Sequence, residues 1–193
     1  QKATEVITSF FERSYRKGLD AVGITALLQS AILSANIEIF DLASKKKELS
    51  GMGTTVVAAY VSNEFTVISH IGDSRAYLID TEVTQLTRDH SVVQFLIENG
   101  KLTYEEARVH PRRNVITRAL GIEAEVLVDS GEFKIKEGQS LLLCSDGLSN
   151  FITKEEIKDI FDNFDIQDVV KALVDKANNN GGGDNITVVT VTP

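Results

Sequence analysis

The chain contains 193 residues, of which 42% are hydrophobic and only 2 are prolines, so it can bury one sizeable core and leaves little room for an interdomain linker. Its 20 Lys and Arg residues are outnumbered by 28 Asp and Glu residues, and the formal net charge of -8 disfavours a broad electrostatic contact with nucleic acid. The lone cysteine, Cys144, excludes an internal disulfide and indicates a reducing compartment. Because the sequence shows neither a signal peptide nor an apolar run of membrane-spanning length, we expect a soluble, cytoplasmic protein without a membrane segment in these residues.

Two helices are predicted at the start of the chain. The first covers about residues 2–16 and is stopped by Gly18. The second covers about residues 20–43 and carries one apolar stripe. The stripe consists of Ile24, Leu27, Leu28, Ala31, Ile32, Ala35, Ile39 and Leu42. A helix of this kind must bury its apolar face, so we expect both helices to pack on a sheet.

Strands are predicted in the segments that follow. Apolar residues at strand spacing cover residues 54–61, 65–71 and 75–79, and three strands in sequence favour an antiparallel meander. Two further strands are predicted at about 126–135 and 139–145. The second of these offers no polar side to solvent, so we expect it to be buried on both faces.

Between residues 87 and 121 the pattern changes to short helices. One covers about residues 92–98, and either Asp89 or Ser91 is expected to cap its N-terminus. The next begins at Thr103, which forms a capping box with Glu106. These short helices are expected to bury less apolar surface than the two-sided strand at 139–145.

Arg112 and Arg113 follow these helices and supply two positive charges in an otherwise acidic chain. They either lie in a solvated loop or contact a phosphorylated protein, because guanidinium groups form charge-assisted hydrogen bonds with phosphate. The sequence leaves both interpretations open.

Two more helices are predicted near the end of the chain. Thr153 and Glu156 form another capping box, and Asp165 or Asp168 starts the last helix. Helices therefore occur at both ends of the sequence, with antiparallel strands between and after them. This order favours an α+β fold of two mainly antiparallel sheets flanked by helices.

Three aspartates, Asp73, Asp146 and Asp184, stand at the ends of predicted strands, where a rigid backbone could bring their side chains together. Carboxylate oxygens without nearby Cys or paired His favour oxygen-preferring cations such as Mg²⁺ or Mn²⁺ over Zn²⁺. Arg75 lies two residues after the first of them and is expected to brace an acidic neighbour, with direct contact to phosphate as the lesser alternative. The alternative is that each aspartate only starts a turn, as Asp commonly does.

Six ordered motifs strengthen the metal-site interpretation. They are GMGTT (51–55), GDSR (72–75), LTRDHS (86–91), HPRRNVITRALG (110–121), LLCSDGL (142–148) and GGGDNIT (181–187). Together they resemble the bacterial branch of the metal-dependent protein phosphatase 2C family, from about the first helix to the C-terminus. Six motifs in order are far more specific than one short pattern.

The resemblance implies the removal of phosphate from phosphoserine and phosphothreonine in proteins, opposite a bacterial Ser/Thr kinase. It implies that Asp146 and Asp184 are ligands of two central Mn²⁺ or Mg²⁺ ions and that Asp73 is associated with a third ion. It also implies a four-layer α/β/β/α sandwich in a single catalytic domain, residues 1–193, with a flap subdomain at about residues 87–121. Phosphorylated proteins are then the partners, and Arg112 and Arg113 are candidates for contacting them.

The chain departs from the family pattern at its start. The family opens with two short strands that carry a phosphate-binding Arg, followed by an Asp-Gly-Met-Gly-Gly segment whose Asp bridges the central ions. Neither feature is present, and Gly51-Met52-Gly53 corresponds instead to the family's later Met-Gly-Thr-Thr segment. We therefore expect this sequence to be an N-terminally truncated form of a longer phosphatase, and the fragment alone to be poorly active.

Hydrolysis by a metal-activated water requires no covalent intermediate, and neither Ser145 nor Cys144 has a recognisable partner base. No general acid can be assigned, because His70 and His90 are both expected to be neutral packed residues. The alternative function is a catalytically silent phosphoprotein-binding module with the same fold. A metal-dependent nuclease is disfavoured by the acidic charge balance.

Overall fold

The computed structural model describes residues 1–192, which form two compact units. The first unit contains residues Gln1–Gly72 and Asp89–Lys134, and the second contains residues Asp73–Arg88 and the chain from Ile135 onward. Each unit has its own antiparallel sheet with its own helices. The α+β class with two antiparallel sheets is therefore confirmed. That residues 1–193 act as one domain with a flap stays a prediction.

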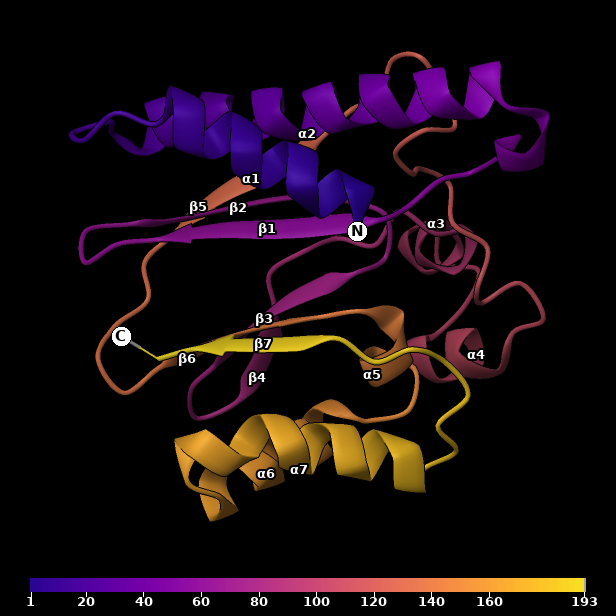
Figure 1. Ribbon diagram of the computed structural model, residues 1–193. Helices are drawn as coiled ribbons and strands as arrows, with labels where there is room; N and C mark the ends of the chain where they lie inside the picture. The colour runs from indigo at the N-terminus through magenta and orange to yellow at the C-terminus, as the bar shows by residue number, and fades with distance from the viewer. Residues whose placement is uncertain (193) are drawn as a thin grey trace. The chain divides into compact units, whose positions relative to one another are not determined.

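The sheet of the first unit has the strand order β1-β2-β5, and all its pairs are antiparallel. Two helices, α1 and α2, pack against each other and cover this sheet (Figure 1). The bounds are α1 Lys2–Ser14, α2 Ala21–Lys45, β1 Val56–Val61, β2 Thr66–Ile71 and β5 Asp129–Phe133, with a short 3-10 helix, η1, at Lys47–Leu49. All six residues of β2, the central strand, are buried.

Helix α2 follows the predicted stripe. Asp20 caps its N-terminus by accepting a hydrogen bond from the N–H of Gly23 at 2.8 Å. Seven of the eight stripe residues are buried: Ile24, Leu27, Leu28, Ala31, Ile32, Ala35 and Ile39. By length and composition α2 could also cross a membrane, contrary to the expectation from sequence. This is weak evidence, because a core helix of a soluble protein passes the same test.

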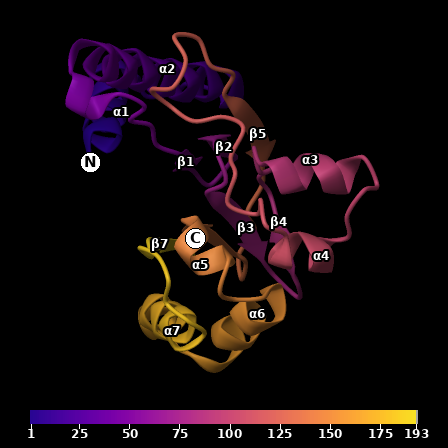
Figure 2. The same ribbon diagram turned by 90° about the vertical axis from the view of Figure 1, so that its right-hand side faces the viewer.

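The short helices α3 (Val92–Glu98) and α4 (Tyr104–Val109) belong to the first unit and lie next to each other (Figure 2). Ser91 caps α3, and the predicted capping box at Thr103 and Glu106 is present with both of its hydrogen bonds. Helix α3 has no buried residue and α4 has one, Ala107. These helices therefore contribute little to the core.

The sheet of the second unit has the strand order β4-β3-β6-β7, again antiparallel throughout. The helices α6 and α7 pack against each other beside this sheet (Figures 1 and 2). The bounds are β3 Arg75–Ile79, β4 Val83–Gln85, β6 Ser140–Cys144, α5 Asp146–Ser149, α6 Lys154–Asn163, α7 Ile166–Asn179 and β7 Val188–Val191.

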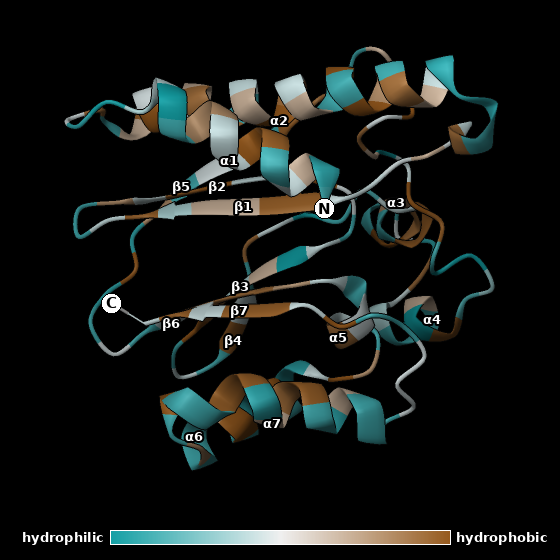
Figure 3. Cartoon of the chain, viewed as in Figure 1, coloured by the Kyte–Doolittle hydropathy of each residue, from teal (hydrophilic) through white to brown (hydrophobic). Residues whose placement is uncertain are grey.

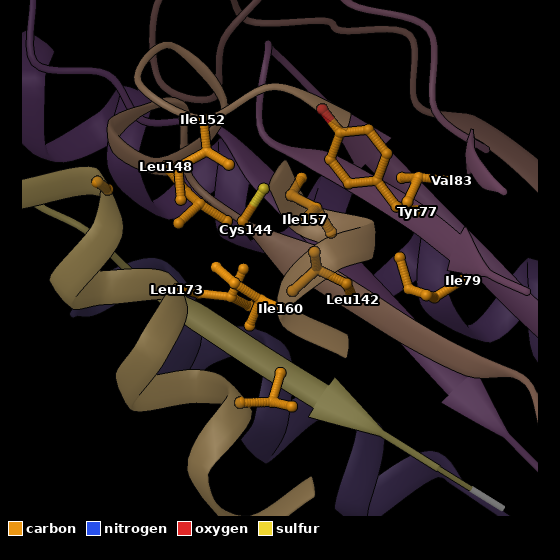
Figure 4. Close-up of a cluster of buried hydrophobic side chains, with 12 residues drawn as sticks. Tyr77, Ile79, Val83, Leu142, Cys144, Leu148, Ile152, Ile157, Ile160 and Leu173 are labelled. Atoms are coloured by element: carbon orange, nitrogen blue, oxygen red, sulfur yellow. The ribbon is translucent and has the colours of Figure 1, made fainter. Parts of the chain in front are cut away.

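The core of the second unit lies between the sheet and the helices. Hydrophobic and hydrophilic residues alternate along α6 and α7, as expected of helices with one buried face (Figure 3). Their inward residues meet those of β3 and β6, and the sulfur of Cys144 lies within this cluster (Figure 4). Cys144 is thus a packed core residue, as its apolar surroundings in the sequence predict.

Two details of the sequence-based prediction are wrong. The three strands before residue 80 do not form a meander: β1 and β2 pair, but β3 belongs to the other sheet. The turn at Gly72, with a φ of 102°, stands where the chain leaves the first sheet. The strand predicted at 126–135 is also shorter, because pairing with β2 begins only at Asp129.

Candidate metal centre

Strand register places three predicted ligands at one end of the second sheet. Asp73 precedes β3, Asp146 follows β6, and Asp184 precedes β7. The first residue of β3, Arg75, pairs with the last residue of β6, and that residue pairs with the first residue of β7. All three aspartates therefore continue from the same end of three neighbouring strands.

Asp146 is half-buried and begins the short helix α5. Burial raises the pKa of its carboxyl, and the charge of Asp184 raises this pKa further, whereas hydrogen bonds from backbone N–H groups and the charge of Arg75 act in the opposite direction. The two carboxylates thus repel each other in the protein alone. Arg75 contributes the positive charge that was expected to brace an acidic neighbour, and the neighbour on which it acts is Asp146.

The loop of Asp184 approaches the backbone next to Asp146 very closely. A Cβ atom at Gly147 would lie 2.2 Å from the carbonyl oxygen of Asn185, so only glycine fits there. Ser145 fixes the same loop: its backbone N–H donates to Thr187 O at 3.1 Å, and its Oγ atom accepts from Thr187 N at 3.0 Å and donates to Asn185 O at 3.2 Å. Asp146 and Asp184 are therefore held near each other by hydrogen bonds of the backbone and of one hydroxyl.

Asp73 lies in the corner between β2 and β3 and is half-buried. The preceding residue, Gly72, has a φ of 102°, and a Cβ atom there would lie 2.3 Å from the Cγ2 atom of Thr55. Both its conformation and its close packing therefore require glycine. The backbone at Gly72, which leads into Asp73, is therefore closely packed within the first unit.

This donor set fits a hard divalent cation. It offers carboxylate oxygens, of which two repel each other until a positive charge is placed between them. The one cysteine of this sheet, Cys144, is buried in the core and offers no sulfur ligand at the surface. An ion such as Mn²⁺ or Mg²⁺ would thus relieve an unfavourable interaction that the fold itself creates.

A second cluster of possible ligand atoms lies in the first unit and joins His70 on β2, His90 and Asp129 on β5, with ligand atoms within 4.8 Å of one another. The rings of His70 and His90 stack with centroids 5.0 Å apart. The Nε2 atom of His90 lies 3.1 Å from Asp129 Oδ2. Arg118 Nη1 lies 2.8 Å from Asp129 Oδ1 and 3.2 Å from His90 Nε2.

The hydrogen bonds of this cluster argue against a metal ion. His90 Nδ1 accepts from the N–H of Gly72 at 3.1 Å, so in the neutral ring the hydrogen atom sits on Nε2 and leaves it no lone pair for a metal. The guanidinium of Arg118 adjacent to Nε2 would also repel a cation. The cluster is a histidine–carboxylate–guanidinium network. Sequence analysis anticipated a neutral His90 packed at the corner but did not single out Arg118 or Asp129.

Arg112 and Arg113, the predicted substrate contacts, are exposed in the turn that follows α4. Their backbone is ordered by His110, whose Nδ1 atom accepts from Arg112 N at 3.1 Å and whose carbonyl accepts from Arg113 N at 3.0 Å. Both side chains belong to the first unit, whereas the three aspartates belong to the second.

The first unit also contains an open cleft of about 880 Å³. Its lining is mixed: glycines at residues 51 and 53, Arg118, two glutamates, and several apolar side chains that include Ile122 and Leu127. None of the predicted metal ligands lines it.

Comparisons of the sequence and the structure with known proteins show the family to which the chain belongs. A family model described as protein phosphatase 2C matches residues 1–179. The serine/threonine phosphatase stp of Listeria innocua is 42% identical over 175 residues, which are 90% of this chain and 69% of that protein. The structure of the serine/threonine phosphatase Stp1 from Staphylococcus aureus is similar with a TM-score of 0.91 and 32% identity, over 98% of this chain and 76% of that chain.

The structure of the catalytic domain of the serine threonine protein phosphatase PstP in complex with 2 manganese ions is similar with a TM-score of 0.83 and 33% identity, over 97% of this chain and 79% of that chain. These similarities extend over nearly all of the described residues, and the family model covers most of the sequence. The resemblance carried by the six motifs is thereby confirmed. The chain belongs to the protein phosphatase 2C family and is a protein phosphatase.

Proposed function

We propose that the protein is a metal-dependent serine/threonine phosphatase that hydrolyses phosphoserine and phosphothreonine in proteins. The observation that carries the proposal is the electrostatic conflict between Asp146 and Asp184, two carboxylates held together by the strand register and by Ser145. Relatives named serine/threonine phosphatases support the substrate class, and the manganese complex of PstP supports the choice of metal.

Asp146 and Asp184 would hold the central ions, together with any ligands contributed from outside this sequence, and Asp73 would contact a third. A phosphomonoester is hydrolysed so slowly in water that an enzyme must lower the barrier by more than about 20 kcal/mol. When bound, a pair of divalent cations supplies a water of lowered pKa and a positive charge opposite the phosphate oxygens. The protein's own contribution is to keep the carboxylates ionised and fixed in place.

Arg75 contributes to the same site by balancing the acidic charge. Its charge opposes the rise in the pKa of Asp146 that burial and Asp184 cause, and its Nη1 atom donates to Tyr77 Oη at 3.0 Å, which fixes the guanidinium. A fixed guanidinium suits carboxylate ligands better than a mobile ammonium would. Ser145 is engaged with the loop of Asn185, so it has no free role as a nucleophile.

The second candidate is a silent phosphoprotein-binding module, and the exposed Arg112 and Arg113 favour it. Two mutually repelling carboxylates, with a third at the same sheet end, are unfavourable in a module that binds no metal, which favours the enzyme. We further propose that the protein acts in the cytoplasm of a bacterium and opposes a Ser/Thr kinase. Its acidic charge and lone buried cysteine are compatible with this location.

Two assays with the full-length protein separate these functions. A phosphothreonine peptide and p-nitrophenyl phosphate are incubated with Mn²⁺, with Mg²⁺ or with a chelator, and phosphate release is measured together with peptide binding. The enzyme releases phosphate from both substrates only when metal is present. Binding of the peptide without any release of phosphate would instead identify a binding module.

A further inference from the structure

His90 is a buried residue whose two ring nitrogens are both engaged. Its Nδ1 atom accepts from the N–H of Gly72 at 3.1 Å, and its Nε2 atom faces Asp129 Oδ2 at 3.1 Å. An acceptor nitrogen must carry a lone pair, so the neutral ring has its hydrogen atom on Nε2. The carboxylate of Asp129 is the group that accepts it.

Arg118 helps to keep this tautomer. Its Nη1 atom donates to Asp129 Oδ1 at 2.8 Å and lies 3.2 Å from His90 Nε2. Arginine is only a donor, and Nε2–H is also a donor, so these two groups cannot bond to each other and both point to the carboxylate between them. If the carboxylate were removed, Arg118 could donate to Nε2 and the ring would then protonate at Nδ1.

The hydrogen bond to Nδ1 holds the backbone of Gly72, the residue that precedes Asp73. His90 holds both polar backbone groups of Gly72: its ring accepts from Gly72 N, and its own backbone N–H donates to Gly72 O at 2.9 Å. The second of these groups belongs to the peptide that joins Gly72 to Asp73. Orientation of a metal ligand by a hydrogen-bonded neighbour is common in metal sites, and its loss typically costs about 10–100-fold in metal affinity or activity.

His90 also takes part in the backbone pairing that joins the two ends of the segment containing α3 and α4. Thr117 N donates to His90 O at 2.7 Å, a bridge joins Ser91 to Ile116, and Val92 N donates to Val115 O at 2.9 Å. The two ends of this segment are thus paired, and His90 is where they meet the Gly72 corner.

We propose that His90 is a positioning residue that acts through Nδ1. It fixes the peptide that joins Gly72 to Asp73, the residue proposed as a metal ligand, while Asp129 and Arg118 hold its ring in the tautomer that can accept from Gly72. This inference rests on the proposed function, because it takes Asp73 as a metal ligand.

Two substitutions separate the two nitrogens of the ring. In His90→Asn the side-chain Oδ1 atom can replace Nδ1 and accept from Gly72 N–H. In His90→Gln the side-chain amide can replace Nε2–H and donate to Asp129, but no acceptor remains near Gly72. A residue that only fills space or only pairs with Asp129 would tolerate Gln at least as well as Asn.

The first measurement needs neither metal nor activity. Hydrogen exchange of the Gly72 amide is followed in the metal-free full-length protein. We expect slow exchange in the wild type and in His90→Asn, and exchange about tenfold faster or more in His90→Gln, the change expected for the loss of one buried hydrogen bond. Equal protection in the two variants would overturn the proposal.

A third variant, Asp129→Ala, keeps His90 but removes the carboxylate that holds its ring in the Nε2–H tautomer. It tests the proposal even if His90→Gln does not fold. Nitrogen-15 spectra of the ring are expected to show the hydrogen atom on Nε2 in the wild type and on Nδ1 in this variant, with Gly72 exchange as fast as in His90→Gln. An unchanged tautomer with a protected Gly72 amide would contradict the role given to Asp129.

The second measurement is calorimetric titration with Mn²⁺, alongside kcat and KM for p-nitrophenyl phosphate. His90→Gln is expected to weaken binding of the third ion and to lower kcat by about 10–100-fold with a small change in KM, and His90→Asn to stay within a few-fold of the wild type. Equal titrations and equal kcat in both variants would refute the proposal. A wild type that binds Mn²⁺ but releases no phosphate would refute the proposed function instead, and the amide exchange would still decide the role of His90.

Discussion

The backbone of Gly147 lies so close to the carbonyl oxygen of Asn185 that a Cβ atom would come within 2.2 Å of it. This contact holds the loop of Asp184 against the residue that follows Asp146. Because the neighbouring atom is backbone, it cannot move away as the tip of a flexible side chain could. The spacing of the two carboxylates therefore depends on the absence of a side chain at position 147.

Gly147→Ala is expected to push the loop away and to lower Mn²⁺ affinity by about 10–100-fold, in line with other changes that disturb ligand orientation. The stability cost should be about 1–3 kcal/mol, as for other overpacked sites. Gly138→Ala is a suitable control, because Gly138 has a φ of 84° but open space around its Cα atom. It should cost about 1–2 kcal/mol of stability and leave metal binding unchanged. Calorimetric titration and urea unfolding of both variants test this, and equal Mn²⁺ affinities would contradict it.

The decrease in the free energy of unfolding at acidic pH should depend on His90. Burial lowers its pKa, the hydrogen bond with Asp129 acts in the opposite direction, and the charges of Arg118 and His70 affect it less. A lowered pKa in the folded state means that the neutral ring contributes stability above the unfolded value of 6.5 and that this contribution is lost as the pH falls below it.

Urea unfolding of the metal-free protein between about pH 8 and pH 5 measures this contribution. The wild type should lose stability across this range relative to His90→Asn, which has no ring to protonate. Asp129 does not interfere, because its own pKa is lowered from 3.8 and lies outside the range. Parallel curves for the two proteins would show that His90 is not the titrating group.

Arg112 and Arg113 are expected to act on phosphoproteins and not on small substrates. Replacing both with Ala should reduce turnover of a phosphorylated protein and leave that of p-nitrophenyl phosphate unchanged, because only a protein substrate offers a polypeptide surface for the two guanidinium groups to contact. The control is Lys46→Ala with Lys47→Ala, which removes two exposed positive charges at the end of α2. Equal losses on both substrates would assign the arginines to the catalytic centre.

The segment from 87 to 121 should exchange amide hydrogens faster than β6. Its helices bury only Ala107, whereas four of the five residues of β6 are buried. Segments with few buried apolar contacts open at a lower free energy. Hydrogen exchange with peptide-level resolution tests the prediction. Uniformly slow exchange would argue against a mobile flap.

Much of the fold follows from local patterns. The stripe of α2, the capping boxes at Thr103 and Thr153, and the buried strand before Asp146 are all present as predicted, because each depends on residues within a few positions of one another. The predicted antiparallel meander was wrong because local periodicity does not indicate which strands pair with each other. The change of sheet at Gly72 depends on long-range pairing of β3 with β6.

The candidate site shows the same division. The three aspartates could be found from their positions at strand ends and from the family motifs. That they lie at the same end of one sheet became clear only from the register of β3, β6 and β7. Asp129 was missed because only its pairing with His70 across β2 and β5 brings it to His90. The motifs that contain His90 and Arg118 were visible, but no pattern in the sequence connects the two residues.

Asp146, a proposed metal ligand, should be replaceable without loss of the fold. Ionised Asp146 is disfavoured by burial and by Asp184, so its raised pKa favours folding below the unfolded value of 3.8, and this contribution is lost as the pH rises through the folded value. Asp146→Asn carries no such penalty at neutral pH. The metal-free variant should therefore be at least as stable as the wild type, which urea unfolding can verify.

The most direct measurement is phosphate release from a phosphothreonine peptide by the full-length protein as Mn²⁺ is titrated, in the wild type, Asp146→Asn and Asp184→Asn. The wild type should show saturable activation by Mn²⁺ and no release with a chelator. Each variant should lose more than the ~10–100-fold typical of groups that only orient a ligand, because an anionic ligand itself is removed. Undiminished turnover in either variant, or turnover by the wild type in the chelator, would contradict a metal centre built on these two carboxylates.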